Sequence, residues 1–402
     1  MAMPASGYDE TMNSKPSSSS RPLEGLRVLE FGQIAAGPFA GSLLADLGAD
    51  VVKVERPDGG DGMRVWPPIN QTDKASYSEN FASVNRNKRS ITADMKSTSD
   101  LAHLKALATK ADILLENFRP GVLDRLGLGY DTLAALNPGL IYCSISGYGQ
   151  EGPYAQKGAF DVTVQAMSGL MSVTGEEGAP PVKAGVPVGD FGAGLYAVVC
   201  ILASVHKRHA TGIGARIDCS MLGGLLGMAA LQTSEFFGTG QVPKRLGSAH
   251  PRNAPYKAFK ASDDYFVIAA GNDKLWQTVC ELVGLPELAE APEFKTQLDR
   301  ARNQEQMNTY LDPVFAKRGA RHWLALLDEA GVPCAPINNY ADILSDPHVM
   351  AMRWVQALDL PNGAATQTLG FPMRIEGVDL LKVAAPPALG EHNDEVSRQW
   401  LG

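Results

Sequence analysis

The chain has 402 residues, of which 45% are hydrophobic and 20% are charged, and its formal net charge is −8 at pH 7. This length predicts two domains with a sizeable core, and the composition is typical of a globular enzyme. The acidic balance excludes the overall basic face of a nucleic-acid binder, and the longest apolar run, residues 195–205, is too short to span a membrane.

The amino terminus, residues 1–21, is polar, ends in a serine run and lacks the apolar core of a signal peptide, so we expect a disordered arm. The five cysteines are scattered and never stand in C-x-x-C spacing. This pattern argues against a disulfide framework and a zinc site, and it favours a reducing compartment. We therefore expect a cytoplasmic protein without a bound metal.

The fold is predicted to open with a β-α-β unit. Residues 26–31 predict a buried strand, and a turn at 32–37 leads into a helix whose first residue is Pro38. Residues 50–55 predict a second strand, and Glu55 at its end would suit the ribose of a dinucleotide. The turn lacks G-x-G-x-x-G spacing, however, so an NAD-dependent dehydrogenase is a weak alternative.

Alternation of strands and helices continues to residue 146. Strands are predicted over 89–94, 111–116 and 141–146, with a helix over 98–110. The pattern predicts an α/β fold with a Rossmann-like large domain and a mostly parallel sheet, whose ligands bind at the carboxyl ends of the strands. An acidic protein needs local cations to hold a polyanion there, and the candidates are Arg56, Arg86, Lys88, Arg89, Lys96, Arg119 and Arg125.

Asp190 is the residue on which we expect the chemistry to depend. One glycine precedes it and two more follow, which would let a bulky ligand approach the backbone closely. The apolar run 195–205 predicts a buried helix, so Asp190 lies near a helix N-terminus, where its charge is favoured. From the local sequence alone, an N-cap aspartate without a chemical role is the simpler interpretation.

The regular alternation of strands and helices ends after residue 220. Residues 221–237 predict a helix and 256–270 predict two short strands. Mainly helical sequence follows, before strands and Pro-rich turns return from residue 331. We interpret this part as a smaller α+β domain. The predicted division is a large domain at 22–220, a linker helix and small domain at 221–335, and a return to the large domain at 336–402.

Seven segments occur in an order typical of one family: LRVLEFGQIAAGP, GADVVKVERP, NRNKRSITADMK, ADILLENFRPGVLDRLGLG, NPGLIYCSISGYGQEGP, VPVGDFGAG and LGEHNDEV. Over about residues 23–402, the chain resembles the class III (CaiB/BaiF) CoA-transferases, to which formyl-CoA transferase belongs. The resemblance implies the fold of that family and a homodimer of interlocked chains. It also implies CoA and acyl-CoA as substrates, with no permanently bound cofactor.

The resemblance further implies that Asp190, in the GDFGAG segment, is a nucleophile. It would attack a donor thioester, and mixed anhydrides and an aspartyl-CoA thioester would carry CoA to an acceptor acid. The glycines that flank Asp190 leave backbone N–H groups that could stabilise the oxyanions, and other loops are equal candidates for this role. The positions implied to bind CoA are Gln33, Ile34, Ala35, Arg56, Ala93, Lys96, Asn117, Phe118, Arg125, Leu126 and Met221.

The segment 244–252 matches the glycine-rich loop that formyl-CoA transferases carry over their active site, but it is shorter and lacks the glycines. This difference argues against formyl or oxalyl specificity. Arg245, His250 and Arg252 lie in the segment, and arginine suits bidentate binding of a carboxylate. We therefore expect a short dicarboxylate, such as succinate or a relative of four or five carbons, as acceptor, with succinyl-CoA as a candidate donor.

Two other functions are weaker alternatives. In the related acyl-CoA racemases, a Gly-His-Asp triplet supplies the histidine that moves the α-proton, whereas this chain has Ala159-Phe160-Asp161. Phenylalanine cannot exchange a proton, which leaves Asp161 as a structural acid and disfavours a racemase. A non-catalytic CoA-binding protein is disfavoured by the intact glycine setting of Asp190.

Overall fold

The computed structural model describes residues 21–402, so the predicted arm at 1–21 lies outside the described residues except for Arg21. The chain divides into two compact units. The first contains the described residues up to Val164, Pro187–Met228 and His348–Gly402, and the second contains Gln165–Val186 and Ala229–Pro347. The first unit therefore continues past residue 220, where the sequence analysis places a domain boundary.

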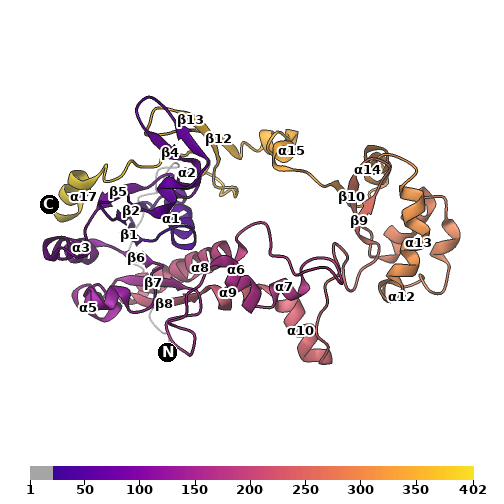
Figure 1. Cartoon of the computed structure of the whole chain (residues 1–402), viewed down its shortest axis with the longest axis horizontal. Helices are drawn as coiled ribbons and strands as arrows, with labels where there is room; N and C mark the ends of the chain where they lie inside the picture. The colour runs from indigo at the N-terminus through magenta and orange to yellow at the C-terminus, as the bar shows by residue number, and fades with distance from the viewer. Residues whose placement is uncertain (1–20) are drawn as a thin grey trace, which may run out of the picture. The chain divides into compact units, whose positions relative to one another are not determined.

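A six-stranded sheet forms the centre of the first unit (Figure 1). Its strands run in the order β5-β2-β1-β6-β7-β8, and all neighbouring pairs are parallel. Their bounds are β1 Arg27–Phe31, β2 Asp50–Glu55, β5 Arg89–Thr92, β6 Ile113–Glu116, β7 Ile141–Ser146 and β8 Ala215–Ser220. The central strands are buried almost throughout, as expected for a parallel sheet covered on both faces. The predicted α/β class with a parallel sheet is confirmed, although β8 was not predicted.

Helices pack on both faces of this sheet. Around Leu104 and Trp400, α3, α5 and α17 form one layer, and the carboxyl-terminal α17 lies beside α3 and β5 (Figure 1). The helices that belong to the first unit or begin in it are α1 Ala36–Asp46, α2 Glu79–Asn85, α3 Thr98–Lys110, α4 Val122–Arg125, α5 Tyr130–Leu136, α6 Asp161–Met167, α8 Val188–Thr211, α9 Met221–Met228 and α17 Asn393–Leu401. The first unit also contains a 3₁₀ turn, Gly62–Val65, and two antiparallel hairpins. One hairpin pairs β3 Ile69–Gln71 with β4 Ser76–Ser78, and the other pairs β12 Val355–Asp359 with β13 Ala365–Leu369. Helix α16, Pro347–Ala351, crosses the boundary between the units.

Helix α1 begins at Ala36, so the prediction that Pro38 is its first residue is wrong by one half-turn. The N–H groups of a first helical turn have no acceptor within the helix, and a proline at the third position therefore removes no hydrogen bond. The extra residues at the start bring the N-terminus of α1 closer to the end of β1.

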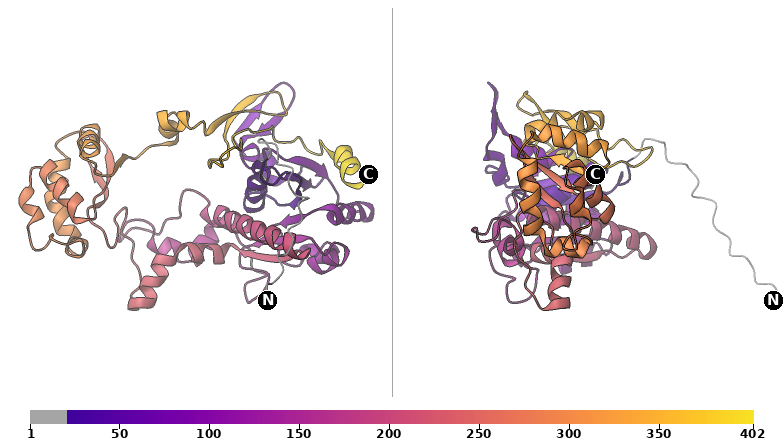
Figure 2. Two further views of the ribbon diagram at one scale, coloured as in Figure 1. Left: turned by 180° about the vertical axis from the view of Figure 1, so that it is seen from behind. Right: turned by 90° about the vertical axis from the view of Figure 1, so that its right-hand side faces the viewer.

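Helix α8 is amphipathic. The sequence analysis predicted a helix buried on all sides, and this prediction is wrong. Ala197 and Ile201 are fully buried, whereas the side chains of Leu195 and Val199 are 53% and 63% exposed. With 24 residues, α8 is also long and apolar enough to cross a membrane by length and composition, contrary to our expectation from the shorter run. One face of it packs against α1, β7 and β8 within the first unit (Figure 2).

The glycines that follow Asp190 serve packing between helices. A Cβ at Gly194 would lie 2.9 Å from a ring carbon of Phe39 and 3.2 Å from the carbonyl oxygen of Ala36. Only glycine allows α8 to approach α1 so closely. The aromatic rings of Phe39 and Phe191 stack at 4.4 Å across the same interface. The interpretation that these glycines admit a ligand to the backbone is therefore wrong for Gly194.

The second unit contains a three-stranded antiparallel sheet, β11-β10-β9, with bounds β9 Tyr256–Lys260, β10 Tyr265–Ala269 and β11 Cys334–Pro336. Its helices are α7 Leu170–Val173, α10 Ala230–Thr239, α11 Asp273–Leu282, α12 Gln297–Arg302, α13 Gln304–Phe315, α14 Ala320–Glu329 and α15 Tyr340–Leu344. The core contains Trp276, Phe259 and Phe315. The strands on either side of residues 262–264 and the helices after 273 agree with the predicted elements.

Candidate functional site

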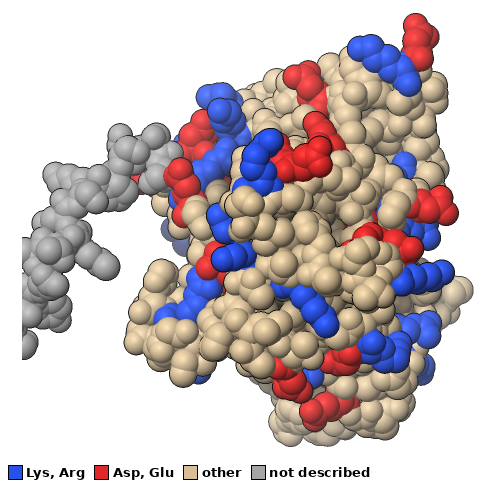
Figure 3. All heavy atoms as spheres, turned by 90° about the vertical axis from the view of Figure 1, so that its left-hand side faces the viewer, with Lys and Arg blue, Asp and Glu red and all other residues tan. Residues whose placement is uncertain are grey.

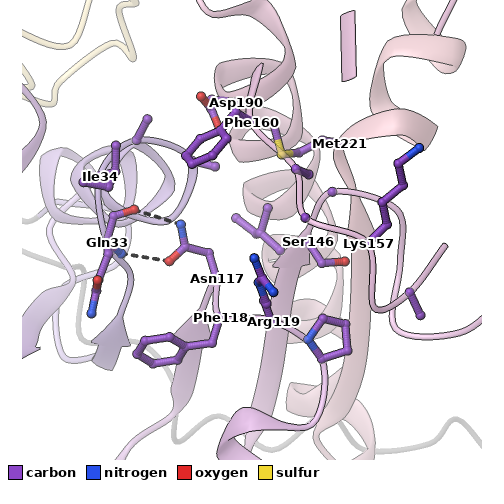
Figure 4. A pocket seen from close by; sticks show the side chains of 18 residues that line it. Gln33, Ile34, Asn117, Phe118, Arg119, Ser146, Lys157, Phe160, Asp190 and Met221 are labelled. Atoms are coloured by element: carbon purple, nitrogen blue, oxygen red, sulfur yellow. Dashed lines mark hydrogen bonds between the residues drawn. The ribbon is translucent and has the colours of Figure 1, made fainter. Parts of the chain in front are cut away.

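A pocket of about 310 Å³ lies at the carboxyl ends of β1, β6 and β7, entirely within the first unit (Figure 4). This is the edge of a parallel α/β sheet at which ligands bind. Its wall is formed by the segments 33–36, 117–120, 145–147 and 155–160, together with Asp190 and Met221. Because β1 and β6 are neighbours in the sheet, the segments that follow them meet although they lie far apart in sequence.

The pocket brings together seven of the residues that the sequence analysis assigns to chemistry or CoA binding. They are Gln33, Ile34, Ala35, Asn117, Phe118, Asp190 and Met221. Five others do not line it. Arg56 donates from Nε to the carbonyl of Gly60 at 2.9 Å, Ala93 is 2% exposed, and Leu126 packs on the core, while Lys96 and Arg125 are exposed. For all of these residues, those in the pocket included, contact with CoA stays a prediction.

Asn117 connects the segment after β6 to the turn after β1. The backbone N–H of Gln33 donates to Asn117 Oδ1 at 2.8 Å, and Asn117 Nδ2 donates to the carbonyl of Gln33 at 2.9 Å (Figure 4). Such a reciprocal pair satisfies a buried backbone unit that belongs to neither a helix nor a strand. The two adjoining pocket walls are therefore fixed to each other.

Asp190 lies in the first turn of α8, where the helix dipole favours a negative charge. The N-cap is Pro187, so the interpretation of Asp190 as an N-cap aspartate is wrong. Burial and, to a smaller extent, the neighbouring Asp161 carboxylate raise the pKa of Asp190 to about 6. Asp190 is thus a partly desolvated carboxylate that is still mostly ionised at neutral pH.

Contact with Asp161 requires a glycine at position 189, directly before Asp190. The Oδ1 atom of Asp161 accepts the backbone N–H of Gly189 at 2.8 Å, and a Cβ at Gly189 would lie 2.9 Å from the same oxygen. This N–H is therefore bound to a carboxylate, and the N–H of Phe191 donates to the carbonyl of Pro187 at 3.0 Å. The prediction that N–H groups of the flanking glycines stabilise the oxyanions is therefore wrong for Gly189, and the alternative that other loops do so stays open.

Sequence reasoning named Arg119 only as one of seven candidate cations and Phe160 only in the comparison with racemases, and it missed Lys157. Arg119 and Lys157 supply positive charge to its wall, and Phe160, which is 77% exposed, lies beside Asp190 in the lining (Figure 4). Arg119 had a signal, because it directly follows Asn117 and Phe118 at a strand end. Lys157 comes from a loop without a regular pattern, and only the fold places it here.

Glu116, the last residue of β6, was also missed. Burial raises its pKa to about 7, although hydrogen bonds oppose the shift. One carboxylate oxygen accepts the backbone N–H of Phe118 at 2.7 Å. Glu116 thus supports the pocket wall from behind without lining the pocket.

Three of the cations proposed for a basic patch are not available to a ligand. Arg86 forms an ion pair with Asp46 at 2.5 Å, Lys88 with Glu30 at 2.8 Å, and Arg89 with Asp50 at 2.5 Å. Residue type and strand position could not reveal these partners, which come from distant parts of the chain. On the face drawn in Figure 3, Lys and Arg are interspersed with Asp and Glu, without one large basic area.

The candidates for the acceptor carboxylate belong to the second unit. Arg252 Nη1 lies 3.0 Å from Glu235 Oε2, and His250 Nδ1 accepts the backbone N–H of Arg252 at 3.1 Å. Burial and, less strongly, Arg252 lower the pKa of His250. Arg245 Nη1 is buried without a hydrogen-bond partner among the described residues. Substrate contact by these three residues stays a prediction. Residues 21–402 contain no group of three or more His, Cys, Asp or Glu side chains that could hold a metal ion.

A parallel α/β sheet with a half-polar pocket at the carboxyl ends of its strands is typical of enzymes that bind nucleotide-bearing ligands. The family model of CoA-transferase family III matches residues 23–393, and the chain belongs to this family. It is therefore a CoA-transferase.

Similar proteins support this assignment. The chain is 37% identical to human succinyl-CoA:glutarate CoA-transferase over 382 residues, covering 95% of this chain and 86% of the relative. It is 39% identical to acetyl-CoA:oxalate CoA-transferase of Acetobacter aceti over 371 residues, covering 92% of each chain. The crystal structure of a CAIB/BAIF family protein from Brucella suis matches with a TM-score of 0.84 at 39% identity, covering 95% of this chain and all of that chain.

Proposed function

We propose that the protein transfers CoA from succinyl-CoA to a short dicarboxylic acid through covalent intermediates on Asp190. The observation that carries this proposal is the position of the Asp190 carboxylate. It lies in the wall of the pocket, partly desolvated, with a pKa of about 6. Such a group is ionised near neutral pH and has lost part of the hydration that weakens a carboxylate nucleophile in water.

The reaction can be written without any net proton transfer. Asp190 attacks the donor thioester carbonyl, the C–S bond breaks, and CoA leaves as a thiolate from the mixed anhydride. The thiolate attacks the Asp190 carbonyl and releases the donor carboxylate, which leaves an aspartyl-CoA thioester. The acceptor carboxylate attacks this thioester and again releases the thiolate. The thiolate then attacks the acceptor carbonyl and regenerates Asp190.

Two features of the pocket support these steps. Arg119 and Lys157 in its lining can interact with the negative charge of a thiolate or carboxylate. The N-terminus of α1 has no side-chain cap, and Ala35 and Ala36 at this end also line the pocket. The N–H groups in the first turn of α1 are therefore candidates for stabilising an oxyanion in the pocket.

The proposed substrates follow from the relatives and from the segment 244–252. Glutarate and oxalate, the acids in the names of the two relatives, are both short dicarboxylates. Succinyl-CoA is the donor named for the human relative, whereas the name of the Acetobacter relative contains acetyl-CoA and oxalate. Because the segment 244–252 lacks the glycine run expected for oxalyl chemistry, we favour an acid of four or five carbons.

The trapped intermediate tests the proposed mechanism. Incubation with succinyl-CoA alone is expected to give a CoA-sized mass increase on the intact protein. Hydroxylamine should convert the adduct into a hydroxamate on the peptide that contains Asp190. An adduct with another acyl-CoA but not with succinyl-CoA would retain the mechanism and remove this donor. No adduct with any donor would contradict the covalent mechanism, and α-proton exchange without an acceptor acid would then favour the racemase.

We also propose that two copies of the chain associate, as the family resemblance implies. Support comes from exposed apolar side chains on α8 and α9, which include Leu195, Val199 and Leu226 at 53%, 63% and 45% exposure. Apolar side chains grouped on helix surfaces are typical of interfaces between subunits. Equilibrium sedimentation should give about twice the chain mass of 42.8 kDa, and a mass equal to one chain would contradict the proposal.

A further inference from the structure

Behind the pocket wall lies a group of charged side chains that the proposed reaction does not use. Lys53 on β2 is fully buried, and its Nζ lies 3.2 Å from Glu30 Oε1 and 2.9 Å from Asp61 Oδ2. Lys88 Nζ, also fully buried, lies 2.8 Å from the other carboxylate oxygen of Glu30. Two cations and two carboxylates therefore balance in the interior, where an unpaired charge would be costly. None of the four side chains lines the pocket.

Lys53 and Asp61 keep their charges in the folded protein, whereas burial lowers the pKa of Lys88 to about 8. Burial by itself would lower the pKa of Lys53, but the Glu30 and Asp61 carboxylates outweigh burial and raise it. Burial would raise the pKa of Asp61, but Lys53 and the backbone N–H of Met63 outweigh burial and lower it. Lys53 and Asp61 are thus an ionised pair around neutral pH.

This ionised pair reaches the pocket through the turn after β1. Lys53 Nζ donates to the carbonyl of Gly32 at 2.5 Å. Two residues further along, the backbone N–H of Ile34 donates to both carboxylate oxygens of Asp61, each at 3.1 Å. Gln33, between these two contacts, is held by Asn117 on the opposite side (Figure 4). Side chains from other elements therefore hold three successive residues of the turn.

The turn needs such support because Ile34 has a φ of +64°. In this left-handed region the Cβ of an L-residue crowds the backbone, and the cost is greatest for a β-branched side chain. A residue stays in such a conformation only where its surroundings impose it. The Ile34 side chain packs beside the cluster of Met63 and Phe81, and the contact that holds its amide is the one with Asp61.

We propose that Asp61, itself held by Lys53, is a positioning residue that keeps Ile34 in the left-handed conformation and so shapes the wall that binds CoA. The three residues that follow Gly32 all line the pocket, so a change in their backbone would move the wall itself. That this wall binds CoA depends on the proposed function, whereas the effect of Asp61 on the conformation of the turn does not.

A double-mutant cycle between Asp61→Asn and Ile34→Gly tests this role. Both carboxylate oxygens of Asp61 face hydrogen-bond donors, whereas an asparagine has only one acceptor oxygen. In the variant, the amide NH₂ group would therefore face either Lys53 or a backbone N–H, and one hydrogen bond would be lost. In the protein with Ile34, Asp61→Asn is expected to weaken CoA binding about tenfold. In the protein with Ile34→Gly, the same change should cost about threefold or less, because glycine adopts a positive φ without strain.

The measurements are calorimetric titration with CoA and amide hydrogen exchange of the turn in the free protein. Asp61→Asn should speed exchange at Ile34, and the matched control Asp58→Asn, an exposed carboxylate of the same loop, should change neither readout. Equal losses of CoA affinity with Ile34 and with glycine, or no faster exchange, would overturn the positioning role. Failure of the unaltered protein to bind CoA would instead contradict the proposed function, and the exchange experiment would still decide whether Asp61 holds the turn.

Discussion

Replacing Asp190 by asparagine is expected to lower kcat by about 10⁴-fold or more, because the amide cannot form the anhydride that starts the reaction. Single-turnover measurements with an acyl-CoA donor check this, and the variant should also give no hydroxylamine-sensitive adduct. CoA binding should survive, since the amide has the size of the carboxylate. A variant that retains more than about a tenth of the turnover would exclude Asp190 as the nucleophile.

The same variant should be more stable than the unaltered protein at alkaline pH. Folding raises the pKa of Asp190 from 3.8 to about 6, so the folded state favours the neutral acid. This stabilising contribution is present below the unfolded pKa and is lost as the pH rises through about 6. Asparagine cannot ionise, and it should raise the free energy of unfolding at about pH 8 by roughly 1–2 kcal/mol, allowing for partial solvent exposure. The gain should vanish near pH 4.

Asp161→Asn is the matched control for the pH dependence. It removes the negative neighbour of Asp190 but keeps an oxygen that can accept the N–H of Gly189. In the unaltered protein, kcat/KM should fall as the pH decreases through about 6, and in the Asp161→Asn variant this decrease should occur at lower pH. An unchanged pH profile would mean that the Asp161 charge does not act on the nucleophile.

Replacing Lys53 by methionine is expected to destabilise the first unit by about 3–5 kcal/mol at neutral pH. Methionine nearly fills the space, but Asp61 loses its cation at 2.9 Å and Glu30 loses one of its two partners. The loss should decrease in acid. Because folding lowers the pKa of Asp61, its contribution is present above the unfolded pKa and is lost as the pH falls through the folded value.

Amide hydrogen exchange of β1 and β2 in increasing urea measures this loss within the unit concerned. Lys96→Met is the matched control, since Lys96 is exposed in the loop after β5, and it should change the stability by about 0.5 kcal/mol or less. A loss below about 1 kcal/mol in the Lys53→Met variant would contradict a stabilising role of the Lys53 ion pairs.

Much of the first unit could be predicted because its signals are local. Residues 98–110 and 141–146 coincide with α3 and β7, because the N-cap Ser97 marks the start of α3 and β7 is rich in strand-forming apolar residues. Strand β8 was missed although its apolar residues alternate with polar ones, which is the pattern of a half-buried strand. The start of α1 was misplaced because the turn before it is held by Lys53, Asn117 and Asp61, none of which is a local signal.

The sequence by itself determined the family and the parallel α/β class, because the order of the motifs and the pattern of strands can be recognised along the chain. The chemical role of Asp190 stays a prediction. Only the tertiary structure decided which cations face a ligand. Arg86, Lys88 and Arg89 resemble Arg119 in sequence, but each is paired with a carboxylate that lies about 40 to 60 residues earlier in the chain. The tertiary structure also decided that Gly189 leaves room for the Asp161 carboxylate and that Gly194 allows α1 to pack closely on α8. It decided as well that Ile34 is held at a positive φ. Each of these contacts joins segments that lie far apart in the sequence, and a local sequence pattern gives no information about the distance between such segments.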